Sequence, residues 1–366
     1  MASLLNLIDE GSYSNKDAVG LLLSLSKTTH TPGWGLFELT PRCTLSCKMC
    51  YVHLQEKQMY VDELSTSQWL DIIKDAYNAG LIKATLTGGE CMLHPGFKDI
   101  YRFLHEHGVI ISVFTNATLI DRDMVEFFQK YPPEVIQISI YGSSPEGYGN
   151  VCSNSRAFFA VDNALGMLRE AGIRFILAVT ISRYMLTDYY NIFRYCLSTG
   201  ALKIIYNVNL FQPRSSTKKD ILDSNLTVVE KQKVIETAKV LALEEEKHYE
   251  SEAYKGIDDD IKLNKGMLPC KAGISNFSVS WDGKMQPCIT LYGIISYSIK
   301  EYGFLGAWDK VNKWAISYVE PDKCQCCAFN SECNTCPAMN YLETGDFSIP
   351  SSTICDEVKM LSTRLN

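Results

Sequence analysis

Residues 35–50 read GLFELTPRCTLSCKMC, a short apolar run followed by three cysteines on one loop. The cysteine spacing over residues 43–50, C-x3-C-x2-C, fits neither a Cys2His2 finger nor a pair of C-x2-C knuckles. A disulfide framework would not leave three cysteines on one turn. Three ligands are one short of a closed tetrahedral metal site, so either a distant residue completes the site or one position stays open.

The composition favours metal or redox chemistry. The chain has 366 residues and fourteen cysteines, seven of them between Cys270 and Cys336, and the cytosol keeps thiols reduced. Residues 1–30 lack the features of a secretion signal, and no apolar run reaches membrane-spanning length. A net charge of −7 without a Lys/Arg-rich stripe argues against a nucleic-acid partner. We therefore expect a cytoplasmic protein with neither nucleic acid nor membrane as a partner.

Apolar runs alternate with amphipathic helical patterns from residue 35 onward. We expect strands at 35–39, 82–87, 109–114, 134–140, 173–181 and 202–210. The expected helices are one from Ser67 to Gly80, one with Pro95 in its first turn, two that end at Gly108 and Gly172, and two at 186–199 and 227–253. Repeated βα units predict a parallel sheet, and such apolar strands predict burial on both faces.

Six βα units are too few to close an eight-stranded barrel, so the sequence predicts an α/β fold with an open, partial (β/α)6 barrel. Its active site is expected at the carboxyl ends of the strands, where the cysteine loop lies. Beyond residue 262 the pattern changes to short strands and a cysteine-rich loop, CQCCAFNSECNTC at 324–336. We expect an N-terminal extension at 1–34, the barrel at 35–261 and a cysteine-rich domain at 262–366.

The cysteine loop after a first barrel strand resembles the loop of the radical S-adenosylmethionine (SAM) superfamily. In that family three thiolates, here matched by Cys43, Cys47 and Cys50, hold three irons of a [4Fe–4S] cluster. The resemblance implies that the fourth iron binds SAM and that an electron from the cluster cleaves SAM to a 5′-deoxyadenosyl radical. The alternative is a zinc loop that a distant His or Cys completes.

Further strand-end residues resemble the family's SAM-binding positions. Gly88, Gly89 and Glu90 in TLTGGE match the motif that binds the methionine amino group, and a carboxylate there can accept from an ammonium. Asn116 and Ser139 match positions where relatives contact the carboxylate or ribose of SAM, and Arg183 is a weaker candidate. Met49 departs from the family pattern, which has an aromatic residue before the third cysteine, so the adenine contact is expected from Met49 or from Tyr51.

The C-terminal cysteines resemble the SPASM domain, which carries two auxiliary [4Fe–4S] clusters. The matched residues are Cys270, Gly283, Cys288, Cys324, Cys327, Cys333, Cys336 and Cys355. The resemblance implies that Cys324, Cys327, Cys333 and Cys355 hold the outer cluster. Cys270, Cys288 and Cys336 would then hold the inner cluster, which is one ligand short. Either Cys326 supplies the fourth ligand or one iron stays open. The departure from the family is the Cys333–Cys336 spacing, x2 instead of x3.

Three further cysteines match no motif. Cys196 falls on an apolar helical face and is expected in the core. Cys91 follows Glu90, and Cys152 lies near the end of the fourth strand. Buried inert cysteine is the common fate, and a redox or hydrogen-donor role is the alternative for either residue.

The family resemblance implies an oxidoreductase that modifies peptides. Relatives with two auxiliary clusters crosslink ribosomally made peptides or oxidise a Ser or Cys of a target enzyme. We expect a maturase of a peptide substrate, with an electron donor such as flavodoxin or ferredoxin and a separate leader-binding protein as possible partners. The alternatives are a sulfatase-maturase-like oxidase, a tailoring enzyme for a haem-like or quinone cofactor, and a zinc-stabilised binding module. No catalytic base can be assigned from the sequence.

Overall fold

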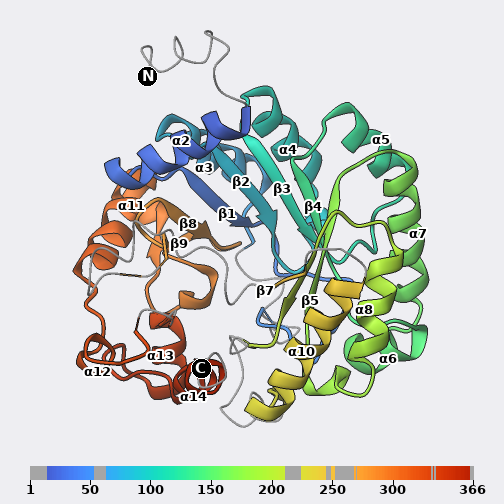
Figure 1. Cartoon of the computed structure of the whole chain (residues 1–366). Helices are drawn as coiled ribbons and strands as arrows, with labels where there is room; N and C mark the ends of the chain where they lie inside the picture. The colour runs from blue at the N-terminus through green and yellow to red at the C-terminus, as the bar shows by residue number, and fades with distance from the viewer. Residues whose placement is uncertain are drawn as a thin grey trace.

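The computed structural model describes residues 15–52, 63–210, 224–244, 249–251, 268, 270–330, 333 and 335–362. Its centre is a ten-stranded sheet in the order β10-β9-β8-β1-β2-β3-β4-β5-β6-β7 (Figure 1). The strands are β1 (Trp34–Glu38), β2 (Lys83–Thr87), β3 (Ile110–Thr115), β4 (Val135–Ser139), β5 (Phe175–Thr180), β6 (Ile204–Asn207), β7 (Tyr249–Ser251), β8 (Asn276–Val279), β9 (Lys284–Gln286) and β10 (Tyr297–Ser298). Strands β1 to β7 are parallel, which confirms the expected α/β fold with an open sheet.

Helices such as α3, α4, α5, α7 and α8 flank the outer face of this sheet (Figure 1). The helices of the chain are α2 (Asn15–Thr29), α3 (Thr66–Asn78), α4 (Phe97–Glu106), α5 (Arg122–Lys130), α6 (Pro145–Cys152), α7 (Ala157–Glu170), α8 (Tyr189–Ser198), α10 (Val228–Glu244), α11 (Ile299–Ser317), α12 (Asp322–Gln325), α13 (Pro337–Thr344) and α14 (Ser352–Ser362). Helices α4 and α7 end just before Gly108 and Gly172, as predicted.

Three details of the helix prediction are wrong. Helix α3 is capped by Ser65 instead of Ser67, because Ser65 forms a capping box with Gln68. Pro95 lies in the turn before α4 rather than in its first turn. The helix expected over 227–253 ends at Glu244, and residues 249–251 instead form β7, which pairs with β6.

The two faces of the sheet are buried unequally. The Phe37 ring packs edge-on against Trp69 of α3, with the ring centroids 6.2 Å apart, so the alternate residues Leu36 and Glu38 point to the concave face. In β4 and β5 every second residue is only half-buried. The prediction of strands buried on both faces is therefore wrong for these two strands, because the partial barrel leaves its concave face partly open.

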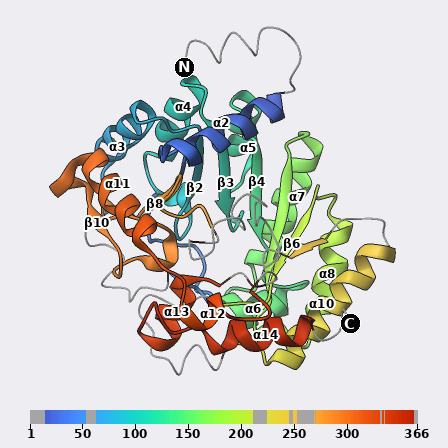
Figure 2. The same cartoon turned by 60° about the vertical axis from the view of Figure 1, so that its left-hand side comes forward.

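The C-terminal part of the chain continues the same sheet. Strand β8 pairs in parallel with β1, and β9 and β10 follow as antiparallel strands. The turn between β8 and β9 spans residues 280–283, and Gly283 adopts φ +74°, which suits glycine in such a hairpin. Figure 2 shows α12, α13 and α14 gathered below the sheet, near α6 and α10. The expected domain boundary at 261/262 lies outside the described residues.

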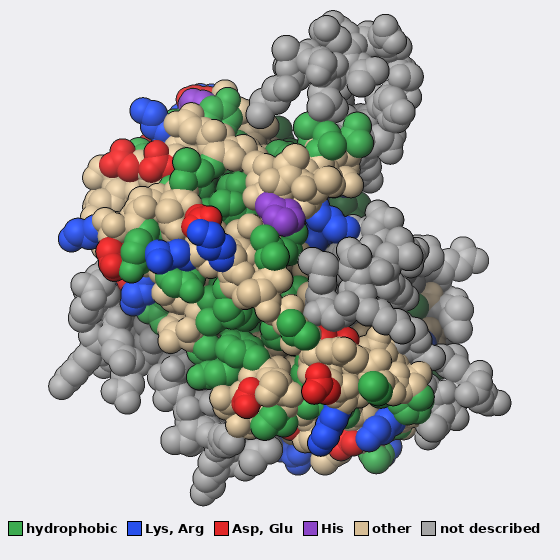
Figure 3. All heavy atoms as spheres, turned by 90° about the vertical axis from the view of Figure 1, so that its left-hand side faces the viewer, with side chains coloured by type: hydrophobic (Ala, Val, Ile, Leu, Met, Phe, Trp, Pro, Cys, Tyr) green, Lys and Arg blue, Asp and Glu red, His purple; other side chains and the backbone are tan. Residues whose placement is uncertain are grey.

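The surface formed by this C-terminal part is partly apolar. Figure 3 views the side of the molecule on which α11 lies, and hydrophobic side chains gather near the middle of this view. Tyr302, Leu305 and Ile316 of α11 are exposed, as is Val319 just beyond it. Within the described ranges, no helix is both long enough and apolar enough to cross a membrane.

Candidate active site

The three cysteines predicted to hold a cluster lie on the loop that follows β1. Cys47 is buried, and Cys43 and Cys50 are half-buried. The Cys43 sulfur accepts hydrogen bonds from the Leu45 amide and from Asn116 Nδ2, both at 3.4 Å. Amide N–H donors of this kind stabilise a thiolate, which is the form of cysteine that binds metal.

The thiols of this loop lie close enough to affect one another. Burial raises the pKa of Cys43 to about 12, and negative charge on Glu90, Cys47 and Cys50 adds to this shift. Metal binding has to displace these protons. Among the residues that the structure describes, no three His, Cys, Asp or Glu side chains converge on the position of one metal ion. A [4Fe–4S] cluster does not require such convergence, because each thiolate that holds it binds a different iron.

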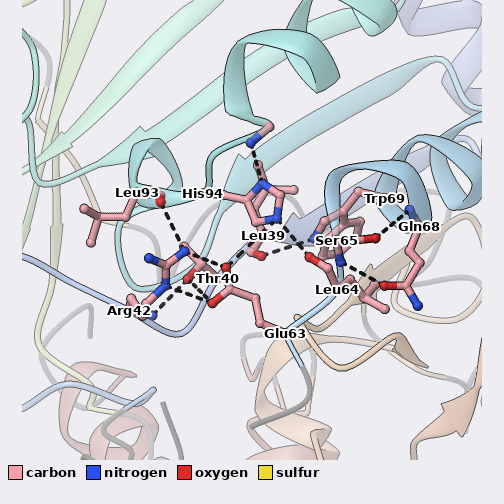
Figure 4. A network of polar contacts seen from close by, with 11 residues as sticks. Leu39, Thr40, Arg42, Glu63, Leu64, Ser65, Gln68, Trp69, Leu93 and His94 are labelled. Atoms are coloured by element: carbon pink, nitrogen blue, oxygen red, sulfur yellow. Dashed lines mark hydrogen bonds and ion pairs between the residues drawn. The ribbon is translucent and has the colours of Figure 1, made fainter. Parts of the chain in front are cut away.

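A polar network fixes the chain just before Cys43 (Figure 4). The Arg42 guanidinium donates to both carboxylate oxygens of Glu63, at 2.9 and 2.7 Å, and to the Leu93 carbonyl at 3.2 Å. Thr40 Oγ1 donates to the same Glu63 carboxylate at 3.0 Å. His94 Nδ1 accepts from the Gly96 amide, so its other ring nitrogen carries the proton and donates to the Leu64 carbonyl. These contacts therefore join the start of the cysteine loop to the segment before α3 and to the segment after β2.

Gly88 and Gly89 are needed because the cysteine loop passes very close to them. A Cβ on Gly88 would lie 2.4 Å from the Thr40 carbonyl oxygen, and one on Gly89 would lie 2.4 Å from the Arg42 carbonyl oxygen. The Gly89 amide donates to Thr40 O and the Glu90 amide to Arg42 O, both at 2.8 Å. The two glycines thus join the end of β2 to the start of the loop, whatever they contribute to SAM.

Glu90 is fully buried beneath the loop. Its carboxylate accepts from Thr115 Oγ1 at 2.8 Å, the Asn116 amide at 2.9 Å and the Met92 amide at 3.3 Å. Burial raises the pKa of Glu90, and these hydrogen bonds oppose the shift. Asn116 connects this carboxylate to the cluster loop, because its Nδ2 donates to Cys43 and to Thr44.

The other predicted SAM residues are spread along the carboxyl edge of the sheet. Ser139 is the half-buried last residue of β4, and Met49 is buried between two cluster cysteines. Tyr51 donates to Glu38 Oε1 at 3.4 Å. Arg183 interacts with a different part of the chain: its guanidinium donates to the Asn225 carbonyl and pairs with Glu230 at 3.5 Å.

The unassigned cysteines have three different environments. Cys196 lies buried on α8, as expected. The Cys91 thiol is buried 3.8 Å from Glu90 Oε1 and 3.6 Å from the Phe114 carbonyl. The Cys152 sulfur lies 3.5 Å from that of Cys47, a neighbour that the sequence did not reveal.

The sequence reasoning also overlooked two residues. Burial raises the pKa of Tyr141, and negative charge on all three loop cysteines adds to this shift, so Tyr141 lies near the loop. Tyr141 lies two residues after Ser139, at the end of β4, and this position could have identified it from the sequence. Glu38, a fully buried acid at the carboxyl end of β1, was visible as the one charge in the run GLFEL.

The C-terminal cysteines fall into two groups. Burial raises the pKa of Cys336 to about 12, and negative charge on Cys288 and Cys270 adds to it. In the second group, burial again raises the pKa values of Cys324 and Cys333, and charge on Cys355 adds to both. Cys327 affects Cys333 and Cys355 in the same way. Cys326 is exposed to solvent.

Comparison with known proteins gives consistent matches. A model of the radical SAM superfamily matches residues 37–194. The chain is 24% identical over 339 residues to the AdoMet-dependent heme synthase of Methanosarcina barkeri, covering 87% of this chain and 95% of that protein. It is 25% identical over 334 residues to the PqqA peptide cyclase of Granulibacter bethesdensis, covering 88% and 87%. It is 29% identical over 181 residues to the sporulation killing factor maturation protein SkfB of Bacillus subtilis, covering 50% and 43%.

The fold is similar to that of a solved structure. The crystal structure of Streptococcus suis SuiB bound to S-adenosylmethionine superposes with a TM-score of 0.71 at 15% identity, covering 94% of this chain and 83% of that chain. The matched residues 37–194 contain the cysteine loop, Glu90 and Asn116. Residues 37–194 therefore form a radical SAM domain, and the chain is an enzyme.

Proposed function

We propose that this enzyme modifies a residue of a peptide substrate, as a maturase of a ribosomally synthesised peptide. The carrying observation is the cysteine loop at the carboxyl edge of the sheet, with Glu90 and Asn116 directly beneath it. The similarity to a PqqA peptide cyclase over most of both chains, and to SkfB over half of this one, supports a peptide substrate. The partly open concave face offers space for an extended chain.

In this proposal Cys43, Cys47 and Cys50 hold a [4Fe–4S] cluster. The donor set fits, since three thiols share one loop and N–H donors point at the Cys43 sulfur. When bound, the cluster and SAM supply a 5′-deoxyadenosyl radical that abstracts hydrogen from the substrate. The residues proposed to bind SAM are Gly88, Gly89, Glu90, Asn116, Ser139 and Met49. Glu38, buried at the end of β1, is a candidate proton acceptor.

We further propose two auxiliary clusters in a domain at 262–366, with the barrel at 35–261. The grouping of Cys324, Cys327, Cys333 and Cys355 supports one four-thiolate site. The grouping of Cys270, Cys288 and Cys336 supports a second site with three thiolates and an open iron. Adjacent Cys326 and Cys327 would have to point to different clusters, which favours the open site over a fourth thiolate from Cys326. A flavodoxin or ferredoxin would supply electrons, and a separate protein could bind the leader.

A haem-like substrate is the second candidate. The similarity to an AdoMet-dependent heme synthase extends over 87% of this chain and 95% of that protein, which favours it specifically. The two functions differ in what enters the concave face: a flat macrocycle or an extended peptide.

One experiment separates the two candidates. The anaerobically purified enzyme is incubated with SAM, a reductant, and either the peptide encoded beside its gene or a porphyrin with unprocessed propionate groups. We expect 5′-deoxyadenosine to form with the peptide and the peptide to change mass. Turnover of the porphyrin alone would overturn the peptide assignment. Protein that contains zinc and no iron would overturn the enzymatic mechanism.

A further inference from the structure

Cys47 is held against the last turn of α6 by contacts on both sides. The Ser46 amide donates to the Cys152 carbonyl at 3.3 Å, and the Lys48 amide donates to the Val151 carbonyl at 3.0 Å. These bonds satisfy carbonyl groups that the end of a helix leaves without an internal partner. They fix the cysteine loop so that the buried Cys47 and Cys152 sulfurs lie 3.5 Å apart.

The direction of the hydrogen bond between these sulfurs depends on metal. In the thiol form Cys47 donates to Cys152. A cysteine that binds iron has lost its proton and can only accept hydrogen bonds. Cys152, whose sulfur lies within hydrogen-bond distance of Cys47, then becomes the donor.

We propose that Cys152 donates a hydrogen bond to the Cys47 thiolate and thereby raises the reduction potential of the SAM-binding cluster. Hydrogen bonds to cluster sulfurs offset negative charge, and the reduced cluster carries one more negative charge than the oxidised cluster. Reduction therefore becomes easier for the electron donor. Cys152 acts through Cys47 and is a positioning residue for the cluster. The inference rests on the proposed cluster at Cys43, Cys47 and Cys50.

The test is a reductive titration of the loaded enzyme, followed by electron paramagnetic resonance of the cluster whose signal changes when SAM is added. We expect a more negative midpoint potential in Cys152→Ala. Cys152→Ser keeps a hydroxyl donor and should stay near wild type. Cys196→Ala removes an equally buried thiol from α8 and is the matched control.

The possible results are distinguishable. If wild type holds no iron at residues 43–50, the proposed function fails. If iron is present but Cys152→Ala has the potential of Cys196→Ala, the present inference fails. Loss of the SAM-binding cluster in both Cys152→Ala and Cys152→Ser would identify Cys152 as a ligand and overturn its role as a donor.

A second measurement uses the cluster-free full chain. Diamide takes two electrons and two protons from a pair of neighbouring thiols and is reduced to a hydrazine, while the thiols form a disulfide. We expect a disulfide-linked peptide pair joining Cys47 to Cys152 in the digested protein. Its absence, when other cysteines are oxidised under the same conditions, would contradict the contact on which the inference depends.

Discussion

At the scale of single residues, one carboxylate, that of Glu90, has two sets of partners. It accepts three hydrogen bonds from the protein while buried, and it is proposed to bind the SAM ammonium. Glu90→Gln should weaken SAM binding by about 1.5–3 kcal/mol, because a charge-assisted hydrogen bond is lost. Equilibrium titration with SAM measures the effect, and iron analysis checks that the cluster is retained. Glu134→Gln, at a half-exposed ion pair with Lys83, is the control. An unchanged dissociation constant would remove Glu90 from the SAM site.

The loop cysteines make a sharper prediction at the same scale. Replacing Cys43, Cys47 and Cys50 together by Ala should abolish SAM cleavage and leave iron at the C-terminal sites, since the barrel has its own apolar core. Formation of 5′-deoxyadenosine and the iron content per chain are the two measurements. The matched variant is Cys196→Ala, which should cleave SAM normally. SAM cleavage at the wild-type rate in the triple variant would refute the assignment.

At the scale of elements, the N-terminus of α14 is capped by the side chain of Glu343 from α13. The Glu343 carboxylate accepts from the Ser352 amide at 2.9 Å, from the Thr353 amide at 3.4 Å and from the Ser351 hydroxyl at 2.5 Å. Burial opposes ionisation of Glu343, but the hydrogen bonds from Ser351 and Ser352 outweigh it and lower the pKa. A negative charge at this end also suits the helix dipole. Glu343 therefore stabilises the helix that carries Cys355.

This cap predicts a pH-independent loss in the neutral range. Glu343→Gln should lower the free energy of unfolding by about 0.5–2 kcal/mol, the usual effect of losing a cap. A lowered carboxyl pKa gives stability that is present above the ordinary pKa of glutamate and is lost only as the pH falls through the lowered value. The loss should therefore be the same at pH 6 and pH 8 in urea unfolding followed by circular dichroism. Glu126→Gln, at an exposed position of α5, is the control, and equal stability of the two variants would contradict the cap.

The elements also show what a sequence can predict. Apolar runs and glycine stops located β1 to β6 and the helices α3, α4, α7, α8 and α10, because these signals are local. The cysteine loop and Glu90 were found because spacing and strand-end position are also local. The contact of Cys152 with Cys47 joins residues 105 positions apart, and the capping of α14 by Glu343 depends on how the chain folds back between α13 and α14. The end of α10 was misplaced because its helical pattern does not reveal that β6 offers a free edge to residues 249–251.

At the scale of the whole molecule, a buried ion pair joins the C-terminal helix to the barrel. Lys231 of α10 and Glu357 of α14 have side chains 1% and 7% exposed, with Nζ and Oε2 3.4 Å apart. Lys231 also donates to Asn209, which follows β6. Removing one partner of a buried pair leaves an uncompensated charge, whereas replacing both by apolar residues is often neutral.

This pair gives a prediction for the attachment of α14. Lys231→Met should lower the free energy of unfolding by about 3–5 kcal/mol, and Lys231→Met combined with Glu357→Leu should recover much of that loss. Urea unfolding measures stability, and limited proteolysis reports release of the C-terminal helix. Lys313→Met breaks an exposed pair with Asp309 and should cost less than about 1 kcal/mol. Equal effects of the two single substitutions would show that the pair does not anchor α14.

The pairing of β1 with β8 imposes an order of events during synthesis. Strand β1 has β2 on one side and β8 on the other, yet about 240 residues separate β1 from β8 in sequence. While the ribosome is still making the middle of the chain, one edge of β1 has no partner, and an unpaired strand edge is a site for association with other chains. The nascent enzyme therefore needs protection at the strand that leads into its cysteine loop until residues 276–279 emerge.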